Sequence, residues 1–313
     1  MKDTFNREIN YLRISVTDLC NLRCEYCMPK DGIKKCSHND IISPERIKEI
    51  VSCAAKLGIS KVRLSGGEPL VRRGIINICK YIKEVDGINE LAMTTNGMLL
   101  SSMANDLLNA GVDRLNISLD TLNKEKYKKI TRGGNIDDVL KGIKKAKEVG
   151  FKNIKINVVL IGGFNDDEIL DFIKFSNDNN VIVRFIELMK IGESRNFPKQ
   201  SFISNDIVLE KCPKLEFVNN DGVSKIYKYK NAIIGLISPI SHEFCNSCSR
   251  IRLTSDGKIK PCLHSFNEID LNNLHGDLLE ETLKKAISSK PQKHHLKEDD
   301  GSDSNRFMNE IGG

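Results

Sequence analysis

The sequence predicts an α/β fold, in which about six strand–helix units form a parallel sheet curved into an incomplete barrel. Two observations carry this prediction. Short β-rich runs, each followed by a polar or helical segment, recur along the first 190 residues. Such alternation implies parallel strands joined by right-handed crossovers. Unusual loops follow four of these runs, at the carboxyl ends of the strands. Six units do not close an eight-stranded barrel, so we expect an open one.

Six runs are predicted to be strands, and two intervening helices carry end signals. The expected strands are 11–17 (YLRISVT), 61–65 (KVRLS), 90–95 (ELAMTT), 114–119 (RLNISL), 154–161 (IKINVVLI) and 181–188 (VIVRFIEL). In SPERIKEIVSCAAKL, Ser43 can cap a helix and Pro44 suits its first position. Gly150 ends the second helix, NIDDVLKGIKKAKEVG.

The four unusual loops indicate where the chemistry lies. CNLRCEYC follows the first expected strand, GGEP the second, TNG the third and SLD the fourth. Enzymes built on βα barrels carry their active sites at the carboxyl ends of the strands. We therefore expect the active site at this end of the sheet.

Beyond about residue 190 the alternation stops. The segment KIYKYKNAIIGLISPIS predicts a pair of strands, and a helix is expected near 278–289. The last segment, KEDDGSDSNRFMNEIGG, is polar, and we expect it to pack weakly. The chain is thus predicted to have two regions, a barrel over 1–190 and a C-terminal region over 191–313.

Composition indicates a soluble, cytoplasmic protein. Of the 313 residues 40% are apolar and 29% charged. No run approaches the ~18 apolar residues of a membrane-spanning helix, and the N-terminus lacks a signal-peptide pattern. The 48 Lys and Arg against 42 Asp and Glu give a net charge of +6. This dispersed charge is compatible with an anionic small molecule, and we expect neither a nucleic-acid nor a membrane partner.

The stretch CNLRCEYC places Cys20, Cys24 and Cys27 at the spacing C-x3-C-x2-C. In a reducing cytosol, clustered cysteines are metal ligands or reactive thiols more often than disulfides. A structural zinc site usually takes four protein ligands. Three thiolates suit a 4Fe–4S cluster with one iron left open for another ligand. We favour the cluster and leave zinc and reactive thiols open.

The C-terminal region contains a second group, CNSC followed after thirteen residues by another cysteine. Its members are Cys245, Cys248 and Cys262. His264 lies two residues further on, so a Cys3His zinc site is a serious alternative. Arg250 and Arg252, beside the thiols, favour a site that faces an anionic or carbonyl-rich ligand. We therefore prefer a second cluster. The remaining cysteines, to which we assign no role, are Cys36, Cys53, Cys79 and Cys212.

Taken together, the motifs resemble known families. The cysteine loop, with Tyr26 before its last cysteine and SGGEP further on, resembles the radical S-adenosylmethionine (SAM) superfamily. The wider set resembles the GTP 3′,8-cyclase (MoaA) family of molybdenum-cofactor biosynthesis, from about residue 8 to the end. That set is RISVTDLCNLRCEYCMP, LSGGEPLVRR, TTNG, NISLD, RFIELM, CNSCSRIRLTSDGKIKPCL and the terminal GG. Segment 195–235 and the part after residue 265 are the least distinctive.

The resemblance implies an incomplete (βα)6 TIM-like barrel, the radical SAM core, whose mouth is closed by a C-terminal α+β extension. It implies two 4Fe–4S clusters, one at each cysteine group, with SAM bound to the first. The implied SAM contacts are Tyr26, Gly67, Ser118 and Met189. The implied GTP contacts are Arg13, Arg63, Thr94, Lys155, Arg250, Ile251 and Arg252. Implied catalytic roles fall on the terminal Gly312 and Gly313, with Arg250 and Arg252.

The implied reaction converts GTP to (8S)-3′,8-cyclo-7,8-dihydroguanosine 5′-triphosphate, the first step of molybdenum-cofactor biosynthesis. A 5′-deoxyadenosyl radical abstracts the ribose C3′ hydrogen, and C3′ then bonds to guanine C8. The implied partners are a second copy of the chain, a flavodoxin- or ferredoxin-type electron donor, and cyclic pyranopterin monophosphate synthase as a pathway neighbour. Two alternatives stay open: a peptide-modifying radical SAM enzyme with an auxiliary cluster, and a zinc-ribbon binding module.

Overall fold

The computed structural model describes residues 1–33, 41–294, 296 and 301–312. Its strands are β1 (Tyr11–Ser15), β2 (Lys61–Ser65), β3 (Glu90–Thr95), β4 (Arg114–Ser118), β5 (Ile154–Leu160), β6 (Ile182–Glu187), β7 (Glu216–Asp221), β8 (Ser224–Tyr229), β9 (Ala232–Ile237), β10 (Arg250–Leu253), β11 (Lys258–Lys260) and β12 (Ile269–Asp270). They form one sheet in the order β12-β11-β10-β1-β2-β3-β4-β5-β6-β9-β8-β7. From β10 to β9 in this order, neighbouring strands run parallel. The order has two ends, so the barrel is open.

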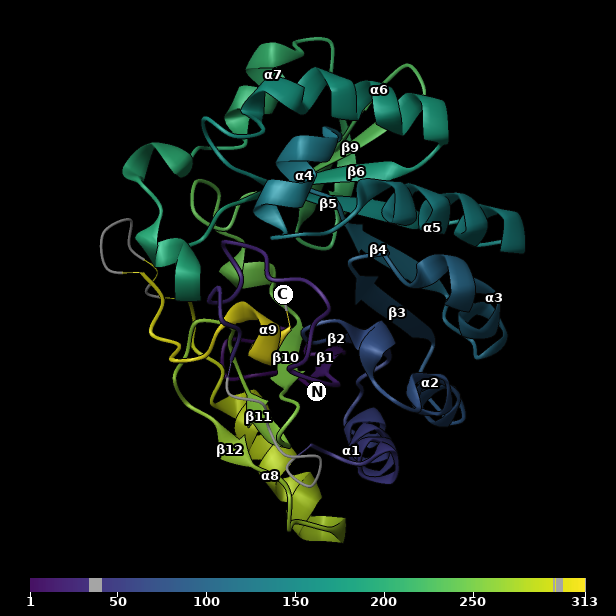
Figure 1. The fold of residues 1–313 in the computed structure, drawn as a ribbon. Helices are drawn as coiled ribbons and strands as arrows, with labels where there is room; N and C mark the ends of the chain where they lie inside the picture. Colours follow the sequence, from purple (N-terminus) through teal and green to yellow (C-terminus); the bar gives the residue numbers. More distant parts are fainter. Residues whose placement is uncertain (34–40, 295, 297–300, 313) are drawn as a thin grey trace.

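Helices cover the outer, convex face of this sheet (Figure 1). The helices of the described residues are α1 (Pro44–Lys56), α2 (Ile75–Lys83), α3 (Leu100–Asn109), α4 (Lys124–Ile130), α5 (Ile136–Val149), α6 (Ile169–Asn179), α7 (Asp206–Lys211), α8 (Gly276–Ser288) and the short α9 (Met308–Ile311), of which α9 lies on the inner side. The predicted end signals are confirmed. The Ser43 hydroxyl accepts a hydrogen bond from Arg46 N–H (3.1 Å), with Pro44 first in α1. Gly150 ends α5 with a φ of 113°.

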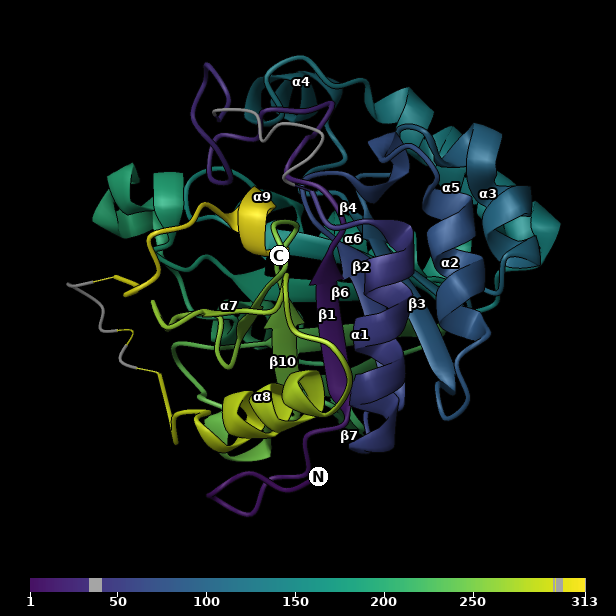
Figure 2. The ribbon, with the colours of Figure 1, turned by 90° about the horizontal axis from the view of Figure 1, so that it is seen from below.

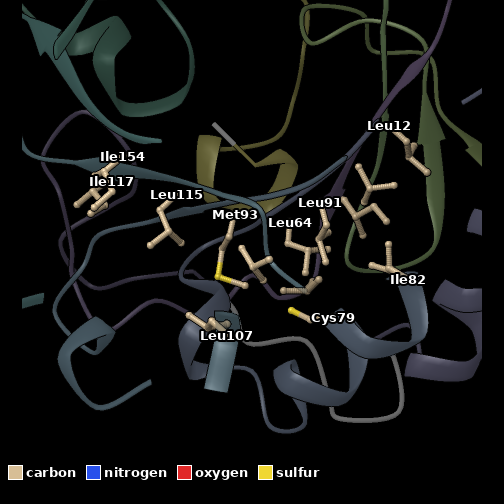
Figure 3. Close-up of a cluster of buried hydrophobic side chains, with 14 of the residues drawn as sticks. Leu12, Leu64, Cys79, Ile82, Leu91, Met93, Leu107, Leu115, Ile117 and Ile154 are labelled. Atoms are coloured by element: carbon tan, nitrogen blue, oxygen red, sulfur yellow. The ribbon is translucent and has the colours of Figure 1, made fainter. Parts of the chain in front are cut away.

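Strand alternation separates a core from a polar interior. In β1, Leu12 and Ile14 are fully buried against the helices, whereas Arg13 faces the inside of the curve. The same pattern in β2 to β5 builds the apolar layer of Figure 3, where strand side chains meet Cys79 and Ile82 of α2 and Leu107 of α3. The helix–sheet interface is therefore the hydrophobic core, and the inner face of the sheet remains available for a polar site.

The six predicted strands are confirmed, but the sheet is wider than predicted. β9 and β10, both from the C-terminal region, add parallel strands beside β6 and β1. Ile251 and Leu253 of β10 join the same hydrophobic core. The two regions that we expect over 1–190 and 191–313 therefore share one sheet, and a boundary at residue 190 stays a prediction.

The C-terminal segment differs most from expectation. The helix predicted near 278–289 is α8, which packs beside α1 (Figure 2). The prediction of a weakly packed tail is wrong for 301–312, since α9 lies inside the curve of the sheet next to β1. Asn309 and Ile311 are both buried. Polar contacts hold the segment, because Arg306 pairs with Asp256 (2.8 Å) and Glu268 (2.7 Å).

Of the cysteines without an assigned role, Cys53, Cys79 and Cys212 are buried, and Cys36 lies outside the described residues. No helix in the described ranges is long and apolar enough to cross a membrane.

Candidate active site

One cavity of about 290 Å³ inside the curve of the sheet reaches both cysteine groups. Its wall includes Cys20, Cys24, Cys27, Cys245, Cys248 and Cys262. The groups are far apart in the sequence. Because β10 runs parallel to β1 with Arg250 opposite Tyr11, Cys245 and Cys248 lie toward the amino end of β1, and the first cysteine loop follows its carboxyl end. The cavity reaches from one group to the other. A ligand in this cavity can therefore contact both.

The first cysteine loop follows β1 and is held by its neighbours. Leu22 N–H donates to the Cys20 sulfur (3.3 Å), and the Asn96 side-chain amide donates to the same sulfur (3.8 Å). Burial raises the pKa of Cys20 to about 11, that of Cys27 to about 12, and that of Cys24 well above its usual range. A bound metal ion deprotonates such thiols by supplying positive charge. The three thiols therefore fit an iron–sulfur cluster.

The SGGEP loop packs directly against the cysteine loop. A Cβ added at Gly67 would lie 2.3 Å from the Leu19 carbonyl oxygen, so only glycine permits this approach. Next to it, the buried Glu68 carboxylate accepts hydrogen bonds from the Thr95 hydroxyl (2.7 Å) and the Asn96 N–H (2.6 Å). Burial raises the pKa of Glu68 to about 7. Glu68 thereby links the SGGEP and TNG loops.

Tyr26 is fixed by the SLD loop after β4. Its hydroxyl donates to Asp120 Oδ2 (2.7 Å), and Asp120 Oδ1 accepts from the Val159 N–H (2.8 Å). Burial raises the pKa of Asp120 to about 6. Because Tyr26 lies between two of the first cysteines, this hydrogen bond orients the loop as well as the ring. Gly67, Ser118 and Met189 line the cavity with Tyr26.

The second cysteine group lies beside cations. Burial raises the pKa of Cys248, but Arg250 and Lys290 outweigh it, and the pKa falls to about 6. The Lys290 ammonium donates to the Arg250 and Pro261 carbonyls (2.9 Å each). His264 also lines the cavity, so all four side chains of the alternative Cys3His zinc site face the same space. In the described part of the chain no three Cys, His, Asp or Glu side chains converge on a single metal position. Cluster ligands need no such convergence, since each binds its own iron.

Buried cations line the rest of the cavity. Arg13, Arg63 and Arg184 reach it from β1, β2 and β6, and Arg250 and Arg252 from β10. Burial lowers the pKa of Arg13 to about 9 and that of Arg63 to about 10. Among the described residues, no carboxylate pairs with Arg13 or Arg63, and the buried Nε atoms of Arg13, Arg63 and Arg184 have no partner. Desolvated cations with free donors favour a polyanionic ligand.

Of the other GTP contacts expected from the sequence, not all line the cavity. Thr94 lines the cavity, but Lys155 does not, because its ammonium is bound by Asp221 (2.5 Å). The expectation that the Ile251 side chain contacts GTP is wrong. Ile251 points from β10 into the hydrophobic core, opposite Arg250 and Arg252, so only its backbone can face a ligand.

Of the two terminal glycines, the structure describes one. Gly312 lies beside the cavity wall, where its carbonyl and that of Ile311 accept hydrogen bonds from Arg252 Nη1. A Cβ on Gly312 would lie 2.1 Å from the Ser65 hydroxyl. Gly313 lies outside the described residues.

Comparison with known proteins agrees with this geometry. The family model described as "Radical SAM superfamily" matches residues 14–176, and "Molybdenum Cofactor Synthesis C" matches residues 181–296. A GTP 3′,8-cyclase of Alkaliphilus oremlandii is 50% identical and covered over 100% of both chains. The chain belongs to the GTP 3′,8-cyclase family. Other members of this family are 46% identical (Clostridium botulinum, 100% of both chains) and 42% identical (Lactiplantibacillus plantarum, 99% and 98%).

Solved structures support the fold assignment. Streptococcus suis SuiB superposes with a TM-score of 0.66 at 18% identity, over 92% of this chain and 68% of that one. The structure of anSMEcpe with bound AdoMet gives 0.65 at 15% identity, over 91% and 82%. The predicted TIM-like radical SAM barrel is therefore confirmed, and the closing of its mouth by the extension stays a prediction. As a radical SAM enzyme, this GTP 3′,8-cyclase family member uses a 4Fe–4S cluster with SAM.

Several residues at the site escaped the sequence analysis. Asp120, Asn157, Arg184 and Lys290 line the cavity, and Glu68 and Asp221 bind residues at its edge. Glu68, Asp120 and Arg184 stand inside motifs that already stood out, SGGEP, NISLD and RFIELM, so attention to each polar residue there could have found them. Asp221 and Lys290 lie in segments with no motif, and nothing local marks them.

Proposed function

We propose that this chain catalyses the conversion of GTP to (8S)-3′,8-cyclo-7,8-dihydroguanosine 5′-triphosphate. The observation that carries the proposal is the shared cavity, in which two three-cysteine groups flank a set of buried arginines. The relatives at 42–50% identity over nearly the whole chain are named for this activity. The cavity also disfavours the peptide-modifying alternative, because its cations suit a compact polyanion better than an extended neutral chain.

In this proposal the first group, Cys20, Cys24 and Cys27, holds one 4Fe–4S cluster. When bound, that cluster and SAM supply the radical that removes a hydrogen atom from the substrate. Tyr26, Gly67, Ser118 and Met189 surround the cofactor. The Asp120–Tyr26 hydrogen bond and the tight Gly67–Leu19 contact keep the cysteine loop in one position. A fixed loop holds the two reactants in line and excludes other hydrogen donors.

The second group, Cys245, Cys248 and Cys262, is proposed to hold another 4Fe–4S cluster whose open iron binds the guanine. The depressed pKa of Cys248 supports this role, since a thiolate beside Arg250 and Lys290 is ready to ligate. Arg13, Arg63, Lys155, Arg250 and Arg252 are proposed to bind the triphosphate, with Thr94 beside them. Gly312, which lies beside Ser65, and Gly313 are proposed to support radical initiation.

The protein is proposed to be cytoplasmic and to work as a homodimer. Its proposed electron donor is a flavodoxin or ferredoxin, and its product is proposed to pass to cyclic pyranopterin monophosphate synthase. No contact in the described residues bears on these partners.

The proposal is tested by iron and sulfide analysis after anaerobic reconstitution, followed by an assay with GTP, SAM and a reductant that supplies the electron for SAM cleavage. We expect about eight irons in the intact protein and about four after replacing Cys245, Cys248 and Cys262 by serine. The intact protein should release 5′-deoxyadenosine and the cyclised nucleotide. Zinc with four irons in the intact protein would contradict the second cluster and the guanine site.

A further inference from the structure

The carboxylate of Asp221 pairs with Lys155, which is proposed to bind the triphosphate, and with Arg184, a further cation of the site. Its Oδ2 accepts hydrogen bonds from Lys155 Nζ and Arg184 Nη2, both at 2.5 Å. Lys155 and Arg184 are buried on strands β5 and β6, with side chains 5% and 7% exposed. The Asp221 side chain is 44% exposed. One accessible anion therefore neutralises two inaccessible cations.

The position of these cations links Asp221 to the cavity. Lys155 shares the inner face of β5 with Asn157 and Val159, both of which line the cavity. Arg184 lines the cavity itself, and its Nε remains without a partner in the described residues. Arg184 thus has one nitrogen on Asp221 and another free for a ligand.

The hairpin that carries Asp221 approaches the barrel closely. Asp221 and Ser224 pair across a two-residue turn, and Gly222 takes a φ of 62°, as in a tight hairpin. A Cβ on Gly235 of β9 would meet the Ser224 hydroxyl at 2.5 Å and the Arg184 side chain at 2.9 Å. The missing side chain at Gly235 lets the turn settle over Arg184. Release of Asp221 would remove the ionic contacts that hold this turn to β5 and β6.

A neighbouring ion pair shows the contrast. Arg114, a partly buried cation near Asp221, pairs with Glu90 (2.5 Å) on the adjacent strand β3. Glu90 is fixed in the sheet and stays with its partner. Asp221 sits at the tip of an exposed edge hairpin, and the six residues of β7 are all exposed. Of these two carboxylates, Asp221 is the one that a ligand can replace.

We infer that Asp221 is a specificity-determining residue, whose carboxylate holds the place of the substrate's terminal phosphate at Lys155 and Arg184 until that phosphate displaces it. The inference rests on the proposed function, with guanine at the second cysteine group and the phosphates extending toward β5 and β6. A nucleotide with a full triphosphate reaches the two cations and releases Asp221. A diphosphate stops short and leaves Asp221 in place.

Competition between Asp221 and the terminal phosphate predicts the direction in which removing the carboxylate changes the affinity for GTP. Removing the carboxylate destabilises the free protein, because two buried cations lose their counter-charge. The complex is unaffected, since there the phosphate has already replaced Asp221. GTP must then bind more tightly to the variant, by linkage.

The test compares the reconstituted wild-type protein with Asp221→Asn by calorimetric titration with GTP and GDP. We expect the Kd of GTP to fall by about fivefold to tenfold, the worth of a half-exposed ion pair on buried cations. The Kd of GDP should change by less than about twofold. Glu216→Gln, which removes a carboxylate from the same exposed strand, should leave both values unchanged.

The outcomes are separable. Unchanged or weaker GTP binding by Asp221→Asn, with normal wild-type binding, would overturn the role of Asp221 but leave the proposed function intact. Equal tightening for GDP would overturn the terminal-phosphate assignment. Wild-type protein that fails to bind GTP would overturn both. Should Asp221→Asn not fold, hydrogen exchange of the wild type decides: GTP should increase exchange at the β7–β8 turn, and added protection there contradicts displacement.

Discussion

At the scale of single residues, the site is dominated by cations held away from water. Burial disfavours their charged forms, so the pKa values of Arg13, Arg63 and Lys155 are all lowered. For an arginine this changes little, since a guanidinium with a pKa near 9 or 10 is still charged at neutral pH. Lys155 is different, because its pKa falls to about 8 through burial and the nearby Arg184 charge. Of these three cations, Lys155 is the one whose pKa lies nearest the working range of an enzyme.

The pKa of Lys155 predicts the direction in which pH changes the affinity for GTP. Below pH 8 the ammonium is charged and attracts phosphate, and above pH 8 an increasing fraction is neutral in the free protein. The Kd of GTP should therefore rise between pH 7 and pH 8.5, a range below the pKa of Arg13, and should steepen as Lys155 loses its proton. Lys155→Arg keeps its charge throughout and should flatten the profile. Titrations at several pH values test this, and an identical slope in both proteins would exclude Lys155 as the source.

Single residues also show where sequence reasoning works and where it fails. Cysteine spacing is a local property, so both groups could be recognised from the sequence. Ile251 is expected to contact GTP. The structure places it on strand β10, where its side chain alternates with those of Arg250 and Arg252 and enters the core. Asp221 and Asp120 act on partners brought near only by the fold, on β5 and β6 for one and in the cysteine loop for the other. No local pattern reports such contacts.

At the scale of elements, the C-terminal segment is the most informative. Its composition is polar, and ion pairs at Arg306 hold it, where a tail is usually held by apolar burial. Composition alone predicts a loose tail, because the carboxylates that receive Arg306 lie elsewhere in the chain. Once anchored, the segment delivers Gly312 to Ser65 and Arg252. The tail is thus an integral part of the cavity wall.

The close approach at Gly312 predicts a large effect from a single methyl group. In Gly312→Ala the Cβ would meet the Ser65 hydroxyl at 2.1 Å, and the φ of 69° adds strain. We expect product formation to drop at least tenfold, with iron content retained, because the segment must move away from Ser65. Gly163→Ala is the matched control, with a φ of 73° and nothing within 4 Å. Equal activity losses in the two variants would mean that backbone strain, not the contact, matters.

At the scale of the whole molecule, one sheet joins what the sequence suggests are two regions. The six central strands could be predicted because each is a short β-rich run between helix signals. The placement of β9 and β10 could not be predicted, because the sequence of a short apolar strand does not indicate which strand it pairs with. The structure sets β10 against β1 and β9 against β6, both in parallel register. This pairing also explains why the second cysteine group, just before β10, reaches the cavity.

Continuity of the sheet predicts that residues 1–190 do not fold alone. Without β9 and β10, the β1 and β6 edges would expose unpaired backbone groups, and the core would lose Ile234, Leu236, Ile251 and Leu253. A 1–190 fragment should therefore aggregate or melt without cooperativity in size-exclusion and thermal experiments. Deleting 297–313 removes none of the strands that the structure describes, so that control should stay folded and lose activity instead. A monomeric, cooperatively folded 1–190 fragment would show that the barrel is an autonomous domain, with β9 and β10 as dispensable additions to its edges.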